Sequence, residues 1–133
     1  MIIMRRVAIV VFTTIFTTLL LAAQGTSDKK EMTYKGYLAD KHCGTGFTKS
    51  GDAKTADAKA KKHPKDCVLS DDCKASGFGL IFKGKFHKFD DAGDKLALNY
   101  LNTTKKEDNL YVQVKGTMDG DAINVTAVKD VKK

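Results

Sequence analysis

The clearest β pattern in the chain is Leu110-Tyr-Val-Gln-Val-Lys-Gly-Thr-Met-Asp-Gly120-Asp-Ala-Ile-Asn-Val-Thr-Ala127. Apolar residues or glycine occupy every second position from Leu110 to Met118, and the same period returns from Ile123 to Ala127. Asp119-Gly120 between the two runs is a typical hairpin turn. Because side chains alternate between the two faces of a strand, this stretch predicts two antiparallel strands, each with one buried face.

Three further strands are expected on the N-terminal side of this hairpin. Residues 32–38 alternate apolar residues or glycine with polar or tyrosine residues, while 78–82 and 85–89 flank Lys83-Gly84 and predict a second hairpin. A short helix over 95–101 follows a turn that offers aspartates as N-caps.

The order is therefore strand, long excursion, strand, strand, short helix, strand, strand. Five strands with a helix between the third and fourth is the order of the OB-fold, a partly open Greek-key barrel. We predict a mainly β, α+β fold: a small five-stranded OB-like barrel forming a single domain over residues 32–133. A helical, cysteine-bearing excursion at 41–76 would join strands one and two. A small α+β sheet is the alternative.

The excursion is poor in apolar residues. Between residues 48 and 66 there is no Leu, Ile, Val, Met, Phe or Tyr, so this run has little apolar area to offset the entropy cost of ordering it. Residues 52–62, rich in Ala and Lys, predict a solvent-exposed helix with Ser50 or Asp52 as N-cap. Pro64 ends that helix. The excursion therefore needs a covalent or metal tether.

The N-terminal residues show the pattern of a secretory signal peptide, which we predict for residues 1–25. Arg5-Arg6 precede an uncharged, mostly apolar run over 7–23 that ends in small residues. A transmembrane anchor is the alternative, but the run is short and contains threonines. We expect cleavage, a linker at 26–31, and a periplasmic or secreted protein without a stable membrane anchor after cleavage.

Charge and composition bear on the partner. The formal net charge is +7, from 23 lysines and arginines against 16 acidic residues, and the arginines are only Arg5 and Arg6. Nucleic-acid binders use arginine for bidentate phosphate and base contacts. Lysines interspersed among aspartates indicate a solvated surface instead, so we expect no nucleic-acid partner. No motif identifies another ligand or an oligomeric state.

Three cysteines, Cys43, Cys67 and Cys73, are the chemically distinctive residues of the excursion. In an exported protein a disulfide is the first expectation, and a bridge would tie down the apolar-poor run. Loop entropy favours closing Cys43 to Cys67 over Cys67 to Cys73 by about 1 kcal/mol, which is too little to choose the pairing. The odd count leaves at least one thiol free, paired with another chain or bound to a metal.

A metal site is the alternative that uses all three sulfurs. Cys43, His63, Cys67 and Cys73 form a Cys₃His set suited to tetrahedral zinc or to a soft ion such as Cu(I), and His42 is a substitute ligand. The spacing lacks the paired Cys-x-x-Cys of common zinc sites.

A reactive thiol is the third interpretation, because Lys41-His42 beside Cys43 could lower its pKa. No Cys-x-x-Cys redox motif supports it. We therefore rank first an exported, non-enzymatic binding or structural module whose Cys/His cluster is disulfide-stapled. A metal-binding periplasmic protein that holds Zn or Cu comes second, and a thiol redox protein centred on Cys43 comes third.

The chain resembles a group of small exported bacterial proteins of unknown function. The resemblance rests on Asp40-x-x-Cys43-Gly44 after the opening strand, the His- and Cys-bearing excursion, Ser76-Gly77 before the first hairpin, and Lys115-Gly-Thr-Met-Asp-Gly120 near the end. It covers nearly all of the predicted mature chain. It implies export and a small β-barrel-like domain, and it supplies no reaction.

Overall fold

The computed structural model describes residues 29–131; the predicted signal peptide and the first residues of the predicted linker lie outside the described residues. The elements follow one another as β1 (Met32–Asp40), α1 (Lys41–Phe47), α2 (Ala53–Lys61), α3 (Lys65–Val68), α4 (Asp71–Ala75), β2 (Phe78–Phe82), β3 (Lys85–Phe89), α5 (Asp91–Thr103), β4 (Tyr111–Asp119) and β5 (Ala122–Asp130). The five predicted strands are confirmed, and so is the helix between the third and fourth.

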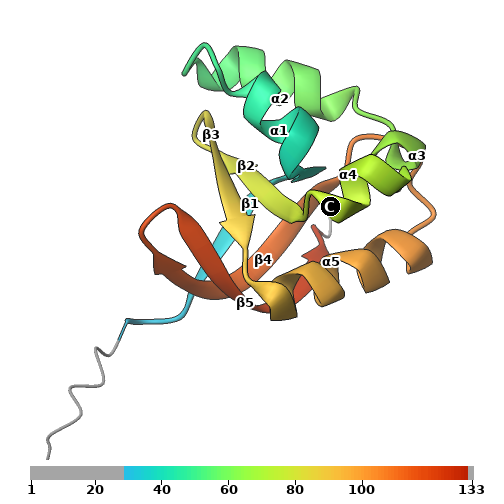
Figure 1. Cartoon of the computed structure of the whole chain (residues 1–133). Coiled ribbons are helices and arrows are strands. Elements are labelled where there is room, and N and C mark those ends of the chain that lie inside the picture. Colours follow the sequence, from blue (N-terminus) through green and yellow to red (C-terminus); the bar gives the residue numbers. More distant parts are fainter. Residues whose placement is uncertain (1–28, 132–133) are drawn as a thin grey trace, which may run out of the picture.

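The five strands pair into a closed ring of hydrogen bonds in the order β1-β2-β3-β5-β4, with β4 returning to β1. Every pairing is antiparallel except β3 with β5, where Lys88 lies beside Ala122 and Phe89 beside Ile123. Figure 1 shows the strands wrapped around a common interior, with α1 and α2 on one side and α5 on the other. The α+β class is therefore confirmed.

The interior of the ring holds the larger of two apolar clusters, which we call the inner core. Its members are buried side chains from every strand and from α5, together with Val68 of α3 and Leu110 just before β4: Tyr34, Leu38, Val68, Phe78, Leu80, Phe89, Ala97, Tyr100, Leu101, Leu110, Val112, Val114, Ile123 and Val125. The helix α5 is joined to the ring by Asp90, whose Oδ1 accepts hydrogen bonds from Gly93 N at 2.9 Å and Val125 N at 3.0 Å. One carboxylate thus caps α5 and fixes it to β5.

The excursion folds into four short helices, of which α1 and α4 were not predicted. The helix α2 and its N-cap are confirmed, because Asp52 Oδ2 accepts a hydrogen bond from Thr55 N at 2.7 Å. The expectation of a solvent-exposed helix was wrong for one face, because Ala56 and Ala60 are buried. They pack against the outside of the ring in a second cluster with Ala39 and Ile81, flanked by Tyr37, Phe47 and Phe86. We call this the outer cluster.

Two glycines let the excursion approach the ring closely. A Cβ on Gly44 of α1 would lie 2.5 Å from Phe86 Cδ2, and one on Gly79 of β2 would lie 2.4 Å from Phe86 Cζ. The Phe86 ring therefore occupies the space that side chains at both positions would need. This contact seats α1 on the sheet and so fixes the position of Cys43.

None of the helices within residues 29–131 has the length and apolar character needed to cross a membrane.

Candidate metal centre

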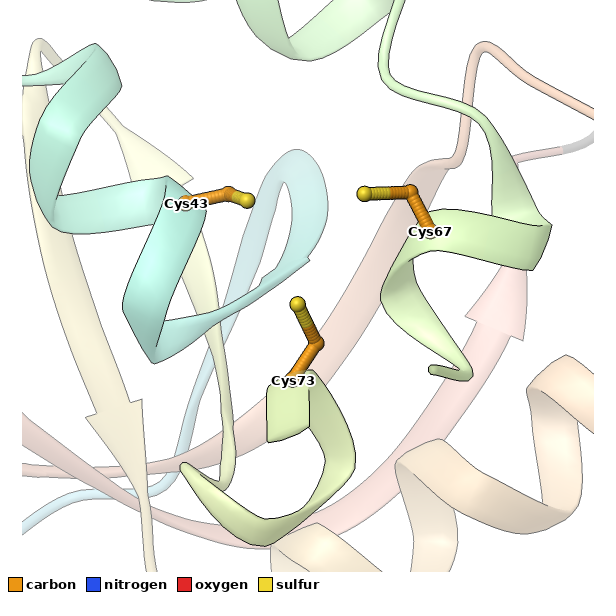
Figure 2. A group of neighbouring side chains, drawn as sticks. All are labelled: Cys43, Cys67 and Cys73. Carbon is orange, nitrogen blue, oxygen red and sulfur yellow. The ribbon is translucent and has the colours of Figure 1, made fainter. Parts of the chain in front are cut away.

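The three cysteines, far apart in sequence, come together at one place in the excursion. Their sulfur atoms lie within 4.8 Å of one another. Figure 2 shows Cys43 on α1, Cys67 on α3 and Cys73 on α4 with their side chains directed into the space between the helices. Three separate helices thus present one sulfur each to a common point.

The local sequence explains each placement. Asp40, the last residue of β1, caps α1 by accepting a hydrogen bond from Cys43 N to its Oδ1 at 2.8 Å. Pro64 starts α3 and so fixes Cys67. The chain bends at Ser70 before α4 begins. One continuous helix would have pointed Cys67 and Cys73 in different directions around its axis, and the bend brings their sulfurs together.

A second group of possible ligands shares Cys43 with the first. Asp40, Cys43 and His63 also place one ligand atom each within 4.8 Å of the others. The predicted set of three cysteines and His63 is therefore divided: the structure groups His63 with Cys43 and Asp40, and the remaining two cysteines with Cys43 alone. Whether these residues hold a metal stays a prediction.

Asp40 and His63 are buried polar residues that each have side-chain atoms without a hydrogen-bond partner. Asp40 is fully buried and His63 is 7% exposed. Asp40 Oδ2 lies 3.8 Å from His63 Nε2, which is too long for a hydrogen bond. Within the described part of the chain, Asp40 Oδ2 and both ring nitrogens of His63 are buried atoms that have no hydrogen-bond partner. Native proteins seldom leave such atoms unpaired, so these three atoms make Asp40 and His63 candidate site residues.

Contacts remote in sequence hold His63 in position. Its ring meets the Phe47 ring edge-on, with centroids 5.1 Å apart. The backbone on either side is bonded to the segment before β4: Asn109 N donates to Lys61 O at 2.9 Å, and Lys65 N donates to Glu107 O at 2.7 Å. These bonds close the corner between α2 and α3 and direct the imidazole toward the end of β1.

His42, the substitute ligand in the sequence analysis, belongs to neither group. It is exposed, and its backbone N donates to Ser76 Oγ at 3.2 Å. Adjacent residues on a helix point about 100° apart, so the burial of Cys43 turns His42 outward. Sequence reasoning missed Asp40 as a site residue. The available signal was its place three residues before Cys43, which is the spacing of an N-cap and therefore puts the carboxylate close to Cys43.

Burial sets the protonation of the cluster. Burial, the Asp40 carboxylate and the other two cysteines raise the pKa of the Cys43 thiol to about 12. The Ser70 side chain acts to lower the pKa of Cys73, but burial and Asp40 outweigh it, so that pKa is raised as well. Burial lowers the pKa of His63, and Asp40 opposes the shift only in part. A lowered pKa favours the neutral imidazole, the form that ligates metals.

All three cysteines are free in the structure. The predicted disulfide therefore finds no support in it. The sulfurs are close to one another but unequally accessible, since Cys73 is buried whereas Cys43 and Cys67 are half-buried. The more exposed side of the cluster is therefore that of Cys43 and Cys67.

Comparison of the chain with protein-family models, with curated proteins and with solved structures gave no match.

Proposed function

We propose that the protein is an exported, non-enzymatic module that binds one thiophilic metal ion through Cys43, Cys67 and Cys73. The observation that carries this proposal is the convergence of three free sulfurs, from three helices, within 4.8 Å of one another. Thiolate ligands favour zinc and Cu(I). The ion would supply the tether that the apolar-poor excursion needs.

Geometry and parity favour a metal over a disulfide. Zinc–sulfur bonds of about 2.3 Å place tetrahedral sulfur ligands about 3.8 Å apart, so sulfurs within 4.8 Å need only a modest contraction. A disulfide would join two of the cysteines and leave the third thiol beside the bridge without a function. A single ion engages all three.

The surroundings of Cys43 argue against a redox or nucleophilic thiol. Reactive cysteines are exposed, electropositive and low in pKa. Cys43 is half-buried next to the carboxylate of Asp40, and its pKa is raised to about 12. A bound cation reverses this penalty, because it replaces the thiol protons directly.

The strand order supports the assignment of an OB-like fold: it is β1-β2-β3-β5-β4, with α5 between β3 and β4 in the chain. OB-folds bind ligands over strands two and three and with the loop between strands one and two. Here that loop is the excursion, and Ala56 and Ala60 of α2 cover part of the outer face around Ile81. We therefore place the binding function in the excursion rather than on the sheet.

The test is the metal content of the mature protein, purified without chelator or reductant and measured by native and denaturing mass spectrometry. We expect one Zn²⁺ or Cu(I) per chain that is lost on denaturation. Cys43→Ser, Cys67→Ser and Cys73→Ser should each abolish it. His42→Ala is the matched control, because this exposed neighbour of Cys43 lies outside both ligand groups.

Two results would overturn the proposal. One is a mass lower by the two hydrogens of a disulfide, with a single alkylatable thiol and no metal. The other is three alkylatable thiols together with failure to take up Zn²⁺ or Cu(I) in an anaerobic titration.

A further inference from the structure

We infer that the ion is four-coordinate Zn²⁺, that His63 is its fourth ligand, and that Asp40 is the positioning residue that orients the imidazole. This inference rests on the proposed function and adds to it the metal, the fourth ligand and the group behind that ligand. It follows from the three buried atoms that lack partners and from the sulfur that the two ligand groups share.

One ion accounts for all three unpartnered atoms. If one nitrogen of His63 binds the ion, the other carries a hydrogen that it can donate to Asp40 Oδ2, which already lies 3.8 Å from Nε2. Histidines that bind metals usually donate their second ring N–H to a carboxylate in this way. Without an ion, closing the same gap would pair Oδ2 with Nε2 but would leave Nδ1 as a buried nitrogen with no partner, which is costly.

Asp40 is placed to serve the ligands from both groups. Its Oδ1 is held by Cys43 N at 2.8 Å, which leaves Oδ2 free for the imidazole. It is the last residue of β1 and pairs with Phe78 of β2, so the sheet fixes its backbone. The carboxylate therefore joins the sulfur ligand of α1 to the imidazole at the corner between α2 and α3.

This arrangement favours zinc over Cu(I). Cu(I) is satisfied by three thiolates and would leave one ring nitrogen of His63 without a partner. Zinc takes four nitrogen or sulfur ligands in a tetrahedron. Three cysteines and His63 supply that number, and the ion would draw His63, which now shares a ligand group only with Cys43 among the cysteines, toward Cys67 and Cys73. A divalent ion also offsets more of the negative charge that three thiolates and the Asp40 carboxylate bring into a largely buried cluster.

The test uses Co²⁺ as a spectroscopic stand-in for zinc, titrated anaerobically into the reduced, metal-free protein. We expect the intense visible bands of tetrahedral Co²⁺ with sulfur ligands. His63→Ala should shift these bands and weaken Zn²⁺ binding by tenfold or more while Cu(I) binding stays unchanged. Added imidazole should restore the bands, because it replaces the lost ligand. His42→Ala is again the control and should behave as wild type.

Asp40→Asn tests the positioning role. The asparagine keeps one carbonyl oxygen that can accept from Cys43 N. Its amide NH₂ takes the place of Oδ2 and cannot accept a hydrogen bond from the imidazole. We expect Zn²⁺ binding to weaken by about 10- to 100-fold, as for other outer partners of metal ligands. The Co²⁺ bands should keep their wild-type positions, and Cu(I) affinity should not change.

The outcomes separate this inference from the proposed function. Wild-type Co²⁺ bands and Zn²⁺ affinity in His63→Ala, or equal weakening of Zn²⁺ and Cu(I), would overturn His63 as a ligand and leave the three-cysteine site standing. Failure of the wild-type protein to bind any of the three ions would overturn the proposed function itself. If His63→Ala does not fold, His63→Gln, which is closer in volume, takes its place in every measurement.

Discussion

The inner core and the outer cluster show two ways of holding chain in place. The inner core contains large aliphatic and aromatic side chains contributed by all five strands and α5. The outer cluster fixes the excursion with Ala56 and Ala60 of α2, set against the sheet and a few half-buried rings. A fully buried leucine or isoleucine stabilises by about 1.5–3 kcal/mol, whereas an alanine methyl contributes much less. The ring therefore has far more apolar area to stabilise it than the excursion, whose buried contribution to the inner core is Val68.

The three cysteines, His63 and Asp40 lie in, or at the edge of, the excursion, which is the region with less buried apolar area. All three sulfurs and His63 belong to the excursion, and Asp40 stands where the ring passes into it. The difference between the two regions is therefore also a difference in what stabilises them: apolar area in one, and a proposed ion in the other.

The largest effect should come from the inner core. Leu101→Ala in α5 removes a side chain that is 1% exposed and should lower the free energy of unfolding by about 2–5 kcal/mol. Leu98→Ala, at a half-buried position of the same helix, should cost clearly less. Urea unfolding of both variants, with and without zinc, gives the values. If the loss at Leu101 depended on zinc, the ring would not be independent of the excursion.

Metal removal should affect the excursion next most strongly. Zinc at about 100 times its dissociation constant should add about 2.7 kcal/mol to the free energy of unfolding, and Cys73→Ser should remove this gain. In metal-free protein, hydrogen exchange should be much faster for the amides of α3 and α4 than for those of β4. Equal protection in the two places would show that the excursion is held without an ion.

Overpacking the outer cluster should have a smaller effect. Ala56 is 0% exposed, so Ala56→Leu should destabilise the protein by about 1–3 kcal/mol. Ala58→Leu on the exposed side of α2 is the matched control and should change stability by less than about 0.5 kcal/mol. A stabilising Ala56→Leu would mean that the outer cluster has unused space and that α2 packs loosely.

The smallest effect is a pH dependence of the free energy of unfolding that arises in the inner core, at Tyr100 of α5. Burial and the hydrogen bond with Asp130 raise the pKa of Tyr100 from 10.0 to about 12. Because the folded-state pKa is raised, the protonated phenol contributes stability that is complete below the unfolded value and is lost as pH rises through the folded value. Tyr100→Phe should therefore lose less stability than wild type between pH 10 and about 12. Parallel unfolding curves for the two proteins would contradict this.

Local patterns predicted the ring well, and long-range contacts explain what was missed. Alternation and turn chemistry located all five strands because both signals lie within a few residues. The helix α1 escaped notice because Gly44 and Gly46 are poor helix formers. It forms because Asp40 caps it and because Gly44 admits the Phe86 ring from another element. The spacing of the cap can be read locally, but no pattern near α1 reveals the contact with Phe86.

The candidate site could likewise be predicted only in part. The cysteines stood out by type and odd number, and an apolar-poor run indicated a tether. The division into two ligand groups could not be predicted, because the position of His63 depends on backbone hydrogen bonds that join its neighbours to Glu107 and Asn109. Asp40 was missed as a site residue because its place three residues before Cys43 is explained by helix capping alone. Only the fold shows that capping uses Oδ1 and leaves Oδ2 facing His63.

The pairing of β1 on both of its edges has a consequence for the folding rate. Tyr37 lies opposite Ile81 of β2 on one edge and opposite Tyr111 of β4 on the other, so closing the ring joins distant parts of the chain. Such pairings pay loop-closure entropy before they gain contacts, and they slow folding. The three cysteine ligands all lie within residues 43–73. We therefore expect an ion bound to these cysteines to draw the excursion together before the ring closes, and so to shorten the loop that β1 and β4 must still bridge.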